Sequence, residues 1–147
     1  MNLKDRTAIE NLIFRYARSV DMADYETLGA LFTQAKITAN KTDEVLEGPA
    51  RISEYWRSTN KRYACGTPRT HHVVSNLEFD TDADDAIRVR SYFTVFQEAP
   101  KLPLQPIACG RYDDSFVRSP DGWRFGSKHI EVTLLGNMAE HLNIDIG

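Results

Sequence analysis

The N-terminal part of the chain carries the spacing of amphipathic helices. Apolar side chains recur at intervals of three and four over residues 9–20, which places them on one face of a helix. A second, shorter helix is expected after Asp24, a typical N-cap residue, and a third after Gly48, with a proline at its first position. The third helix places Tyr55 and Trp56 on its apolar side.

From Pro68 onward the apolar positions recur with a period of two, which is the pattern of strands. The pattern predicts four long strands, rich in Val, Ile, Tyr, Phe and Thr, at Thr70–Thr81, Ala86–Glu98, Ile107–Arg118 and Trp123–Leu135. Two short strands are expected at 36–39 and 44–47. Turn residues separate the long strands, and the proline-bearing segment Pro100–Pro106 is expected to be a loop.

Helices followed by a meander of strands indicate an α+β fold. A sheet of long, twisted strands that is covered by helices on one face must curl. We therefore expect a cone-shaped fold, in which a curved mixed or antiparallel sheet wraps around the N-terminal helices. The hollow between sheet and helices is where a small apolar ligand would bind. Neither a repeat nor a linker interrupts the pattern, so residues 1–147 are expected to form one domain.

The composition argues against nucleic acid and membranes as partners. The net charge is −3 and the pI is about 5.8, without a cluster of Lys and Arg, so nucleic-acid binding is not expected. The chain has no apolar leader segment and no apolar run long enough to cross a membrane, so we expect a cytoplasmic protein without a membrane partner. Cys65 and Cys109 cannot form a zinc site by themselves and are expected to be small buried side chains.

Two polar residues stand on the apolar stripe of the first helix. Asp21 lies four residues after Ala17, so its carboxylate either caps the next helix or points to the rim of a pocket. Tyr16 lies on the same broad face, where a tyrosine is usually a core residue whose hydroxyl reaches a partner. Both residues are candidates for a catalytic role only if another ionisable side chain lies beside them.

His71 and His72 open the first long strand. A lone histidine on a strand is more often structural than catalytic, but a carboxylate partner can orient an imidazole for proton transfer. Strict alternation places His71, and not His72, on the face of Val73 and Leu77. Either the pocket lies on the other face at this end of the strand, or a β-bulge shifts the alternation.

Three segments, Ile9–Leu28, Arg69–Asn76 and Gly110–Phe125, resemble proteins of the SnoaL-like branch of the nuclear transport factor 2-like superfamily. Within this branch the chain is most similar to scytalone dehydratase, bile acid 7α-dehydratase and hexachlorocyclohexane dehydrochlorinase. Those enzymes eliminate water or HCl from a ring without a metal or an organic cofactor. They use an Asp-His pair formed by the first helix and the first long strand.

The resemblance implies a role for each candidate residue. Asp21 matches the aspartate, and His72 matches the histidine because the Thr-x-His spacing and the following Asn76 favour it over His71. Tyr16 matches a tyrosine of the bile acid enzyme. Scytalone dehydratase also has a second histidine, whose equivalent would fall near Phe96 or Gln97, where this chain has no histidine.

These observations lead to the hypothesis of a lyase that needs no cofactor or metal and acts on a small hydrophobic ring compound. In it, His72 is the general base, Asp21 orients and charges the imidazole, and Tyr16 stabilises a developing oxyanion. Aromatic residues expected to line the substrate pocket are Tyr55, Trp56, Tyr92, Phe96 and Trp123.

Three other functions remain open. An isomerase or polyketide cyclase would use the same proton-transfer pair. A non-catalytic subunit, like the β subunit of ring-hydroxylating dioxygenases, would have a filled pocket and a large partner, and a ligand-binding module would have a pocket without turnover. By analogy with the branch we also expect a homo-oligomer, a trimer or a dimer, formed through the outer face of the sheet.

Overall fold

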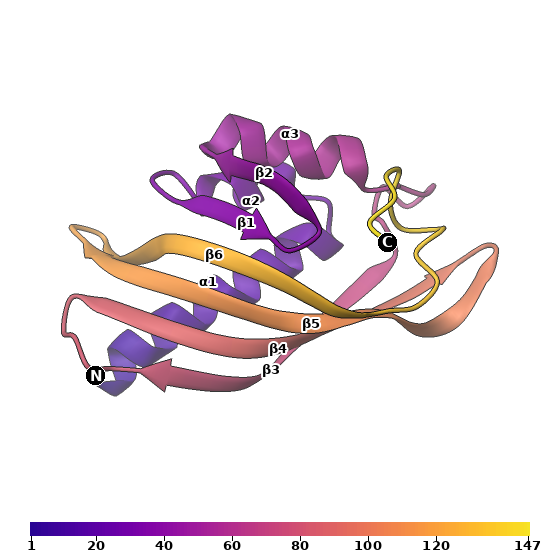
Figure 1. Cartoon of the computed structure of the whole chain (residues 1–147). Coiled ribbons are helices and arrows are strands. Elements are labelled where there is room, and N and C mark those ends of the chain that lie inside the picture. The colour runs from indigo at the N-terminus through magenta and orange to yellow at the C-terminus, as the bar shows by residue number, and fades with distance from the viewer.

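The computed structural model describes all 147 residues and contains three helices and six strands (Figure 1). Helix α1 (Leu3–Asp21) begins earlier than its apolar stripe, because the side chain of Asn2 caps it by accepting a hydrogen bond from the backbone of Asp5. Helix α2 (Tyr25–Ala30) is capped by Asp24, and α3 (Pro49–Thr59) begins with its proline, both as predicted.

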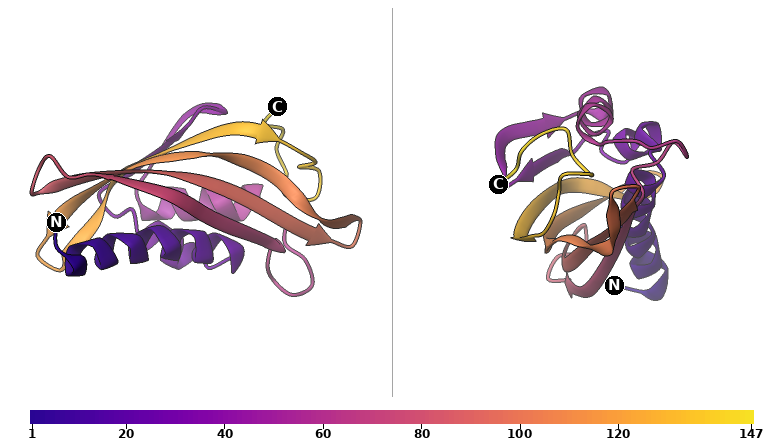
Figure 2. Two further views of the ribbon diagram at one scale, coloured as in Figure 1. Left: turned by 90° about the horizontal axis from the view of Figure 1, so that it is seen from below. Right: turned by 90° about the vertical axis from the view of Figure 1, so that its right-hand side faces the viewer.

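The strands form one mixed sheet in the order β2-β1-β6-β5-β4-β3. Their bounds are β1 Lys36–Ala39, β2 Thr42–Glu47, β3 Thr70–Asp80, β4 Ala86–Ala99, β5 Leu102–Ser119 and β6 Gly122–Leu135. Only β1 and β6 run parallel, and every other pair is antiparallel. Helix α1 crosses one face of this twisted sheet, and the strands curve around the side on which the helices pack (Figure 2). The α+β fold predicted from the sequence is therefore confirmed.

The prediction of a loop at Pro100–Pro106 is wrong. Strand β5 already begins at Leu102, whose partner in β4 is Ala99, so only two residues are left for the turn. Strand β6 reaches β5 only from Ala108 onward, which leaves the first part of β5 at the edge of the sheet. An edge strand tolerates prolines because their missing N–H groups are not needed for pairing.

A β-bulge in β3 decides which histidine faces inward. The pairing with β4 shifts between Ser75 and Glu78, and Asn76 has a φ of 57°, in the left-handed region. Before the bulge His71 is exposed and His72 points inward, and after it Leu77 lies on the inner side. The bulge therefore explains why simple alternation assigned the wrong histidine.

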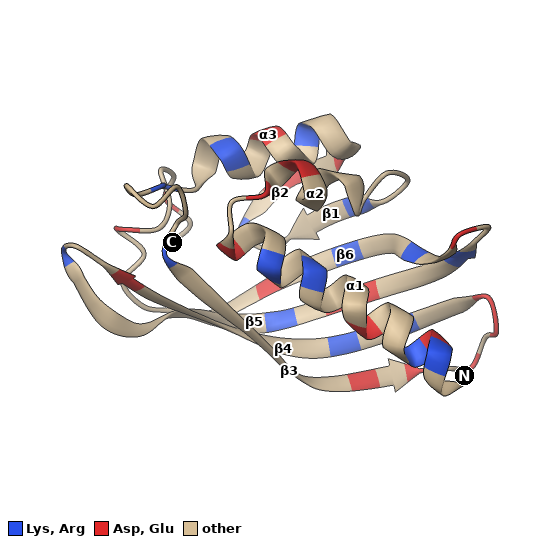
Figure 3. Ribbon diagram, turned by 180° about the vertical axis from the view of Figure 1, so that it is seen from behind, with Lys and Arg blue, Asp and Glu red and all other residues tan.

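The core lies between the helices and the concave face of the sheet. It is one cluster of 23 buried apolar residues that includes Ile9, Ile13, Leu28 and Ile52 from the helices. Charged side chains of both signs are interspersed along α1 and the long strands (Figure 3). Cys109 is half-buried but Cys65 is exposed, so the prediction that both thiols are buried is wrong. None of the helices is long and apolar enough to cross a membrane.

Candidate active site

Asp21 and His72 meet where the end of α1 passes the start of β3. The Nδ1 atom of His72 lies 2.5 Å from one carboxylate oxygen of Asp21, and the backbone N–H of His72 donates to the other oxygen at 2.8 Å. The hydroxyl of Thr70 also donates to Asp21 at 2.8 Å. One carboxylate therefore fixes both the backbone and the ring of His72.

The charge and tautomer of this pair follow from these contacts. Burial acts to raise the pKa of Asp21, but the hydrogen bonds and charge of His72, with the hydroxyl of Thr70, outweigh it and hold the pKa below its usual value. Asp21 is thus a carboxylate at neutral pH. Since a carboxylate only accepts hydrogen bonds, Nδ1 of His72 carries a proton, and in the neutral form of the imidazole the lone pair is on Nε2. This imidazole side chain is 8% exposed, and Nε2 has no partner in the protein.

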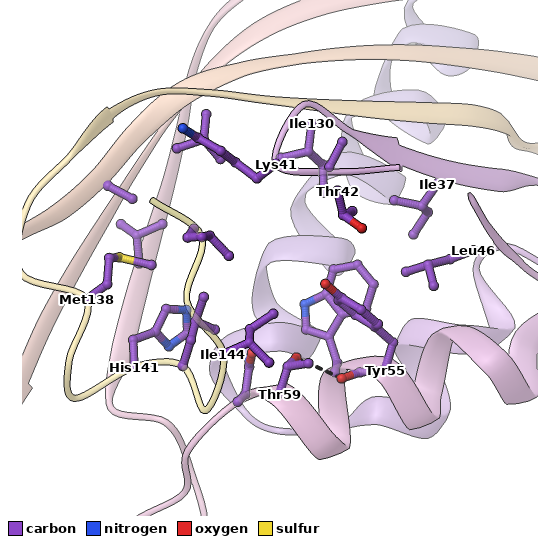
Figure 4. A pocket seen from close by; sticks show the side chains of 18 of the residues that line it. Ile37, Lys41, Thr42, Leu46, Tyr55, Thr59, Ile130, Met138, His141 and Ile144 are labelled. Atoms are coloured by element: carbon purple, nitrogen blue, oxygen red, sulfur yellow. Dashed lines mark hydrogen bonds between the residues drawn. The ribbon is translucent and has the colours of Figure 1, made fainter. Parts of the chain in front are cut away.

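A cavity of about 400 Å³ is lined by Tyr16 and His141, whereas Asp21 and His72 are not among its lining residues. It lies between the β1–β2 hairpin, α3, the inner face of the sheet and the C-terminal tail of residues 136–147 (Figure 4). Sixteen of its 24 lining residues are hydrophobic, among them Trp56, Phe93 and Met138. Its size and apolar lining suit a small ring compound.

Tyr16 links the cavity to the pair. It lies one and a half helical turns before Asp21 on α1, is 2% exposed and lines the cavity. Its ring makes edge contacts with Phe32, Trp56 and Tyr112, which fix its position. Burial, with the charge of Asp114, raises the pKa of Tyr16 well above its usual value, so its hydroxyl remains a hydrogen-bond donor.

The remaining predicted pocket residues divide into two groups. Tyr55 and Trp56 line the cavity, on the inner side of α3. Tyr92 and Phe96 point to the outer face of β4, opposite to buried neighbours in that strand, and Trp123 lies at the far end of the molecule, where it donates a hydrogen bond to Asp5. Contrary to the prediction, these three residues do not line the cavity.

The geometry can be compared with known proteins. The family model of the SnoaL-like domain matches residues 1–129. The chain belongs to the SnoaL-like family.

Solved structures share the fold of this SnoaL-like chain. An NTF2-like protein of Novosphingobium aromaticivorans is 21% identical and has a TM-score of 0.73, covering 94% of this chain and 87% of its own. A putative scytalone dehydratase of the same species has 23% identity and a TM-score of 0.72, with coverages of 92% and 88%. The hexachlorocyclohexane dehydrochlorinase LinA-type3 of Novosphingobium barchaimii has 18% identity and a TM-score of 0.72, with coverages of 93% and 92%. At these identities the likeness establishes the nuclear transport factor 2-like fold alone.

Two features of this SnoaL-like chain were missed from the sequence. Lys128 and Asp114 form a fully buried ion pair, with 3.2 Å between Nζ and Oδ1, and the ammonium lies 3.5 Å from the ring centre of Tyr112. Burial raises the pKa of Asp114 to about 6 and lowers that of Lys128. Alternation in β5 places Asp114 inward with Tyr112 and Phe116, but a register shift between Phe125 and Ser127 in β6 turns Lys128 inward, and alternation alone does not predict it.

The second missed residue is His141, which lines the cavity from the C-terminal tail. This tail has no helical or strand periodicity, so no pattern pointed to it. Asp21 and His72 are not themselves in the cavity wall, but His141 is close enough for the charges of both to act on its pKa. No three His, Cys, Asp or Glu side chains are grouped in a way that would hold a metal ion.

Proposed function

We propose that this SnoaL-like protein is a lyase that eliminates water or a hydrogen halide from a small hydrophobic ring compound without a cofactor. The observation that carries the proposal is the Asp21-His72 hydrogen bond, 2.5 Å long, which leaves Nε2 of the imidazole without a partner in the protein, while Tyr16, from the same helix as Asp21, lines an apolar cavity. A base held in this way needs no reorientation before it accepts a proton.

The reaction follows from the arrangement. Nε2 of His72 takes a proton from a ring carbon, and the electron pair of the broken C–H bond forms the new double bond as the bond to the leaving group breaks. Asp21 stabilises the imidazolium formed in this step. For a hydroxyl leaving group, the imidazolium returns the proton to the departing oxygen, so that water leaves and the base is restored.

Tyr16 supplies the second function that an elimination needs. Negative charge develops on an oxygen of the substrate while the proton is removed, and a neutral hydroxyl in an apolar wall stabilises it. Tyr16 stays protonated because burial raises its pKa. It reaches the cavity from the same helix that ends in Asp21, so helix α1 positions both groups.

The comparisons support this class of reaction through the shared fold alone. A putative scytalone dehydratase and a hexachlorocyclohexane dehydrochlorinase have the same fold. An open cavity lined by Tyr16 and His141 favours an enzyme over a structural subunit with a filled pocket. An isomerase or cyclase would use the same pair, and only the product distinguishes it from a lyase.

A substrate screen tests the proposal. The wild-type protein and the variant His72→Asn are incubated with ring compounds that carry a hydroxyl or halide next to an acidic C–H bond, and the absorbance of a new conjugated double bond is followed. We expect turnover by the wild type and a loss of about 10²–10⁴-fold in the variant. Turnover that is equal in both proteins, or a product that is rearranged but has lost no group, would contradict an elimination by His72.

A further inference from the structure

The backbone holds His141 firmly at the wall of the cavity. Its carbonyl accepts a hydrogen bond from the backbone N–H of Lys61 at 2.8 Å, and its neighbour Leu142 forms a β-bridge with Asn60. Asn143 donates to the carbonyl of Thr59 at 2.7 Å. The tail is thus fixed, at His141 and the two residues after it, to the end of α3 and the two residues that follow the helix. The imidazole lies near Met138 and Ile144 (Figure 4).

The imidazole of His141 has no hydrogen-bond partner in the protein. The residue is only 7% exposed, and Nδ1 is closed to solvent and unpaired. Nε2 is also without a partner, but it is not closed off, so it is the nitrogen that a ligand can reach. A buried polar group that lacks a partner destabilises the fold by about 1–3 kcal/mol. An aromatic or aliphatic residue would fill the same space without this cost.

The ring is neutral under ordinary conditions. Burial is the main reason that the pKa of His141 falls to about 4, and the nearby His72 lowers it further, against an opposing effect of Asp21. A neutral imidazole carries one N–H donor and one acceptor nitrogen. It can therefore donate to an oxygen atom in the cavity without placing a second positive charge beside His72.

We propose that His141 is a specificity-determining residue, which hydrogen-bonds an oxygen atom of the substrate and selects ring compounds that carry a carbonyl or hydroxyl group. The inference deepens the proposed function, on which it rests: among possible eliminations, it assigns an oxygenated ring as the substrate and disfavours a purely halogenated one. A chlorine or hydrogen atom in place of the oxygen would leave Nε2 of His141 unpaired, and sites built to hydrogen-bond a substrate discriminate strongly against analogues that lack the group.

Binding of two matched probes tests the proposal without turnover. β-Tetralone and tetralin have the same fused rings and differ by one carbonyl oxygen. We expect the wild type to bind β-tetralone about 2- to 13-fold more tightly than tetralin, which is the usual net effect of one hydrogen bond. In His141→Phe the ratio should fall toward one, and in His141→Gln, which keeps a donor, part of the preference should remain.

Two controls separate a local effect from a loss of the fold. His71→Phe changes an exposed histidine of the same strand as His72 and should leave the ratio unchanged. If His141→Phe unfolds, the wild type alone decides the matter through the NMR shifts of its isotopically labelled histidine nitrogens. The signals of His141 should move with β-tetralone and stay in place with tetralin. The proposal is overturned if β-tetralone binds no more tightly than tetralin, if His141→Phe keeps the wild-type ratio, or if the His141 signals do not respond.

The same measurements distinguish this proposal from the proposed lyase activity. The preference for β-tetralone should persist in His72→Asn, because recognition of the oxygen does not need the base. If the preference depends on His141 but no elimination by His72 is found, the lyase proposal fails and the recognition site stands. If elimination depends on His72 but the ratio of the two affinities is the same in His141→Phe as in the wild type, the recognition proposal fails and the lyase proposal stands.

Discussion

At the scale of single residues, Asp21 has the position that another side chain could least easily take. Its two oxygens accept hydrogen bonds from the hydroxyl of Thr70 and from the backbone and ring of His72. An amide in its place would offer only one accepting oxygen and would turn an N–H group toward one of these donors.

Asp21→Asn should therefore reduce general-base activity by about 10²-fold or more and destabilise the protein by about 1–3 kcal/mol. The measurements are proton exchange of a ketone probe and denaturant unfolding. A matched control is Asp24→Asn, since asparagine caps a helix as well as aspartate and Asp24 is exposed. Activity retained in Asp21→Asn would show that the carboxylate does not support the base.

His141 predicts a dependence of stability on pH. Its pKa is about 4 in the folded protein and 6.5 when unperturbed, so between these values the unfolded chain binds the proton and the folded chain does not. The free energy of unfolding should thus fall as the pH drops through this window, by about 2–3 kcal/mol, and the contribution is fully present above pH 6.5.

The comparison with His141→Gln isolates this effect. Asp114, whose pKa is raised to about 6, acts in the opposite direction, but it is present in both proteins and cancels. Denaturant unfolding at several pH values should show that the difference in stability between wild type and variant changes between pH 6.5 and 4. A constant difference would mean that His141 is not held neutral.

The residues of the site differed in how far sequence could predict them. Asp21 and Tyr16 stood out because they are polar on an apolar helical stripe, and His72 was selected by the resemblance. His141 could not be predicted, because its position depends on hydrogen bonds between the tail and α3. Tyr92 and Phe96 were misassigned because aromatic character alone does not give the side of a strand.

At the scale of elements, the bulge in β3 determines which side chains of this strand face the site. It allows both His72 and Leu77 to face inward, and Asn76 carries the left-handed backbone that it requires. Periodicity predicted the helices and long strands well. It failed where geometry is irregular, at this bulge and at the prolines of β5, since neither follows a fixed spacing.

Asn76→Val should destabilise the protein by about 1–3 kcal/mol, because a β-branched residue is strained at this φ. Asn76→Gly should leave stability nearly unchanged, since glycine adopts this conformation freely. Thermal and denaturant unfolding of the two variants measure the difference. If valine and glycine are tolerated equally, the bulge does not depend on residue 76.

At the scale of the whole molecule, the outer face of the sheet carries apolar side chains away from the cavity. Val73 is 39% exposed, Tyr92 is 53% exposed and Leu134 is 66% exposed. Val73 and Leu134 lie in one row across the paired strands, which continues through Thr94 and Cys109. Such a face fits the expected homo-oligomer, which stays a prediction.

Light scattering coupled to size-exclusion chromatography measures the oligomeric state. The wild type should elute as a dimer or trimer, and Tyr92→Glu should shift it toward the monomer by placing charge in the interface. Lys101→Gln, at the turn between β4 and β5, lowers the net charge by the same single unit elsewhere and serves as the control. A monomeric wild type would contradict the prediction.

In the proposed mechanism His72, held by Asp21, removes a proton from a ring carbon. The most direct measurement is the rate at which the protons beside the carbonyl of β-tetralone exchange in deuterium oxide, followed by NMR. We predict exchange faster than in buffer with the wild type and with His71→Asn, and a loss of about 10²–10⁴-fold in His72→Asn. Exchange at the wild-type rate in His72→Asn, or no acceleration by the wild type, would contradict the claim.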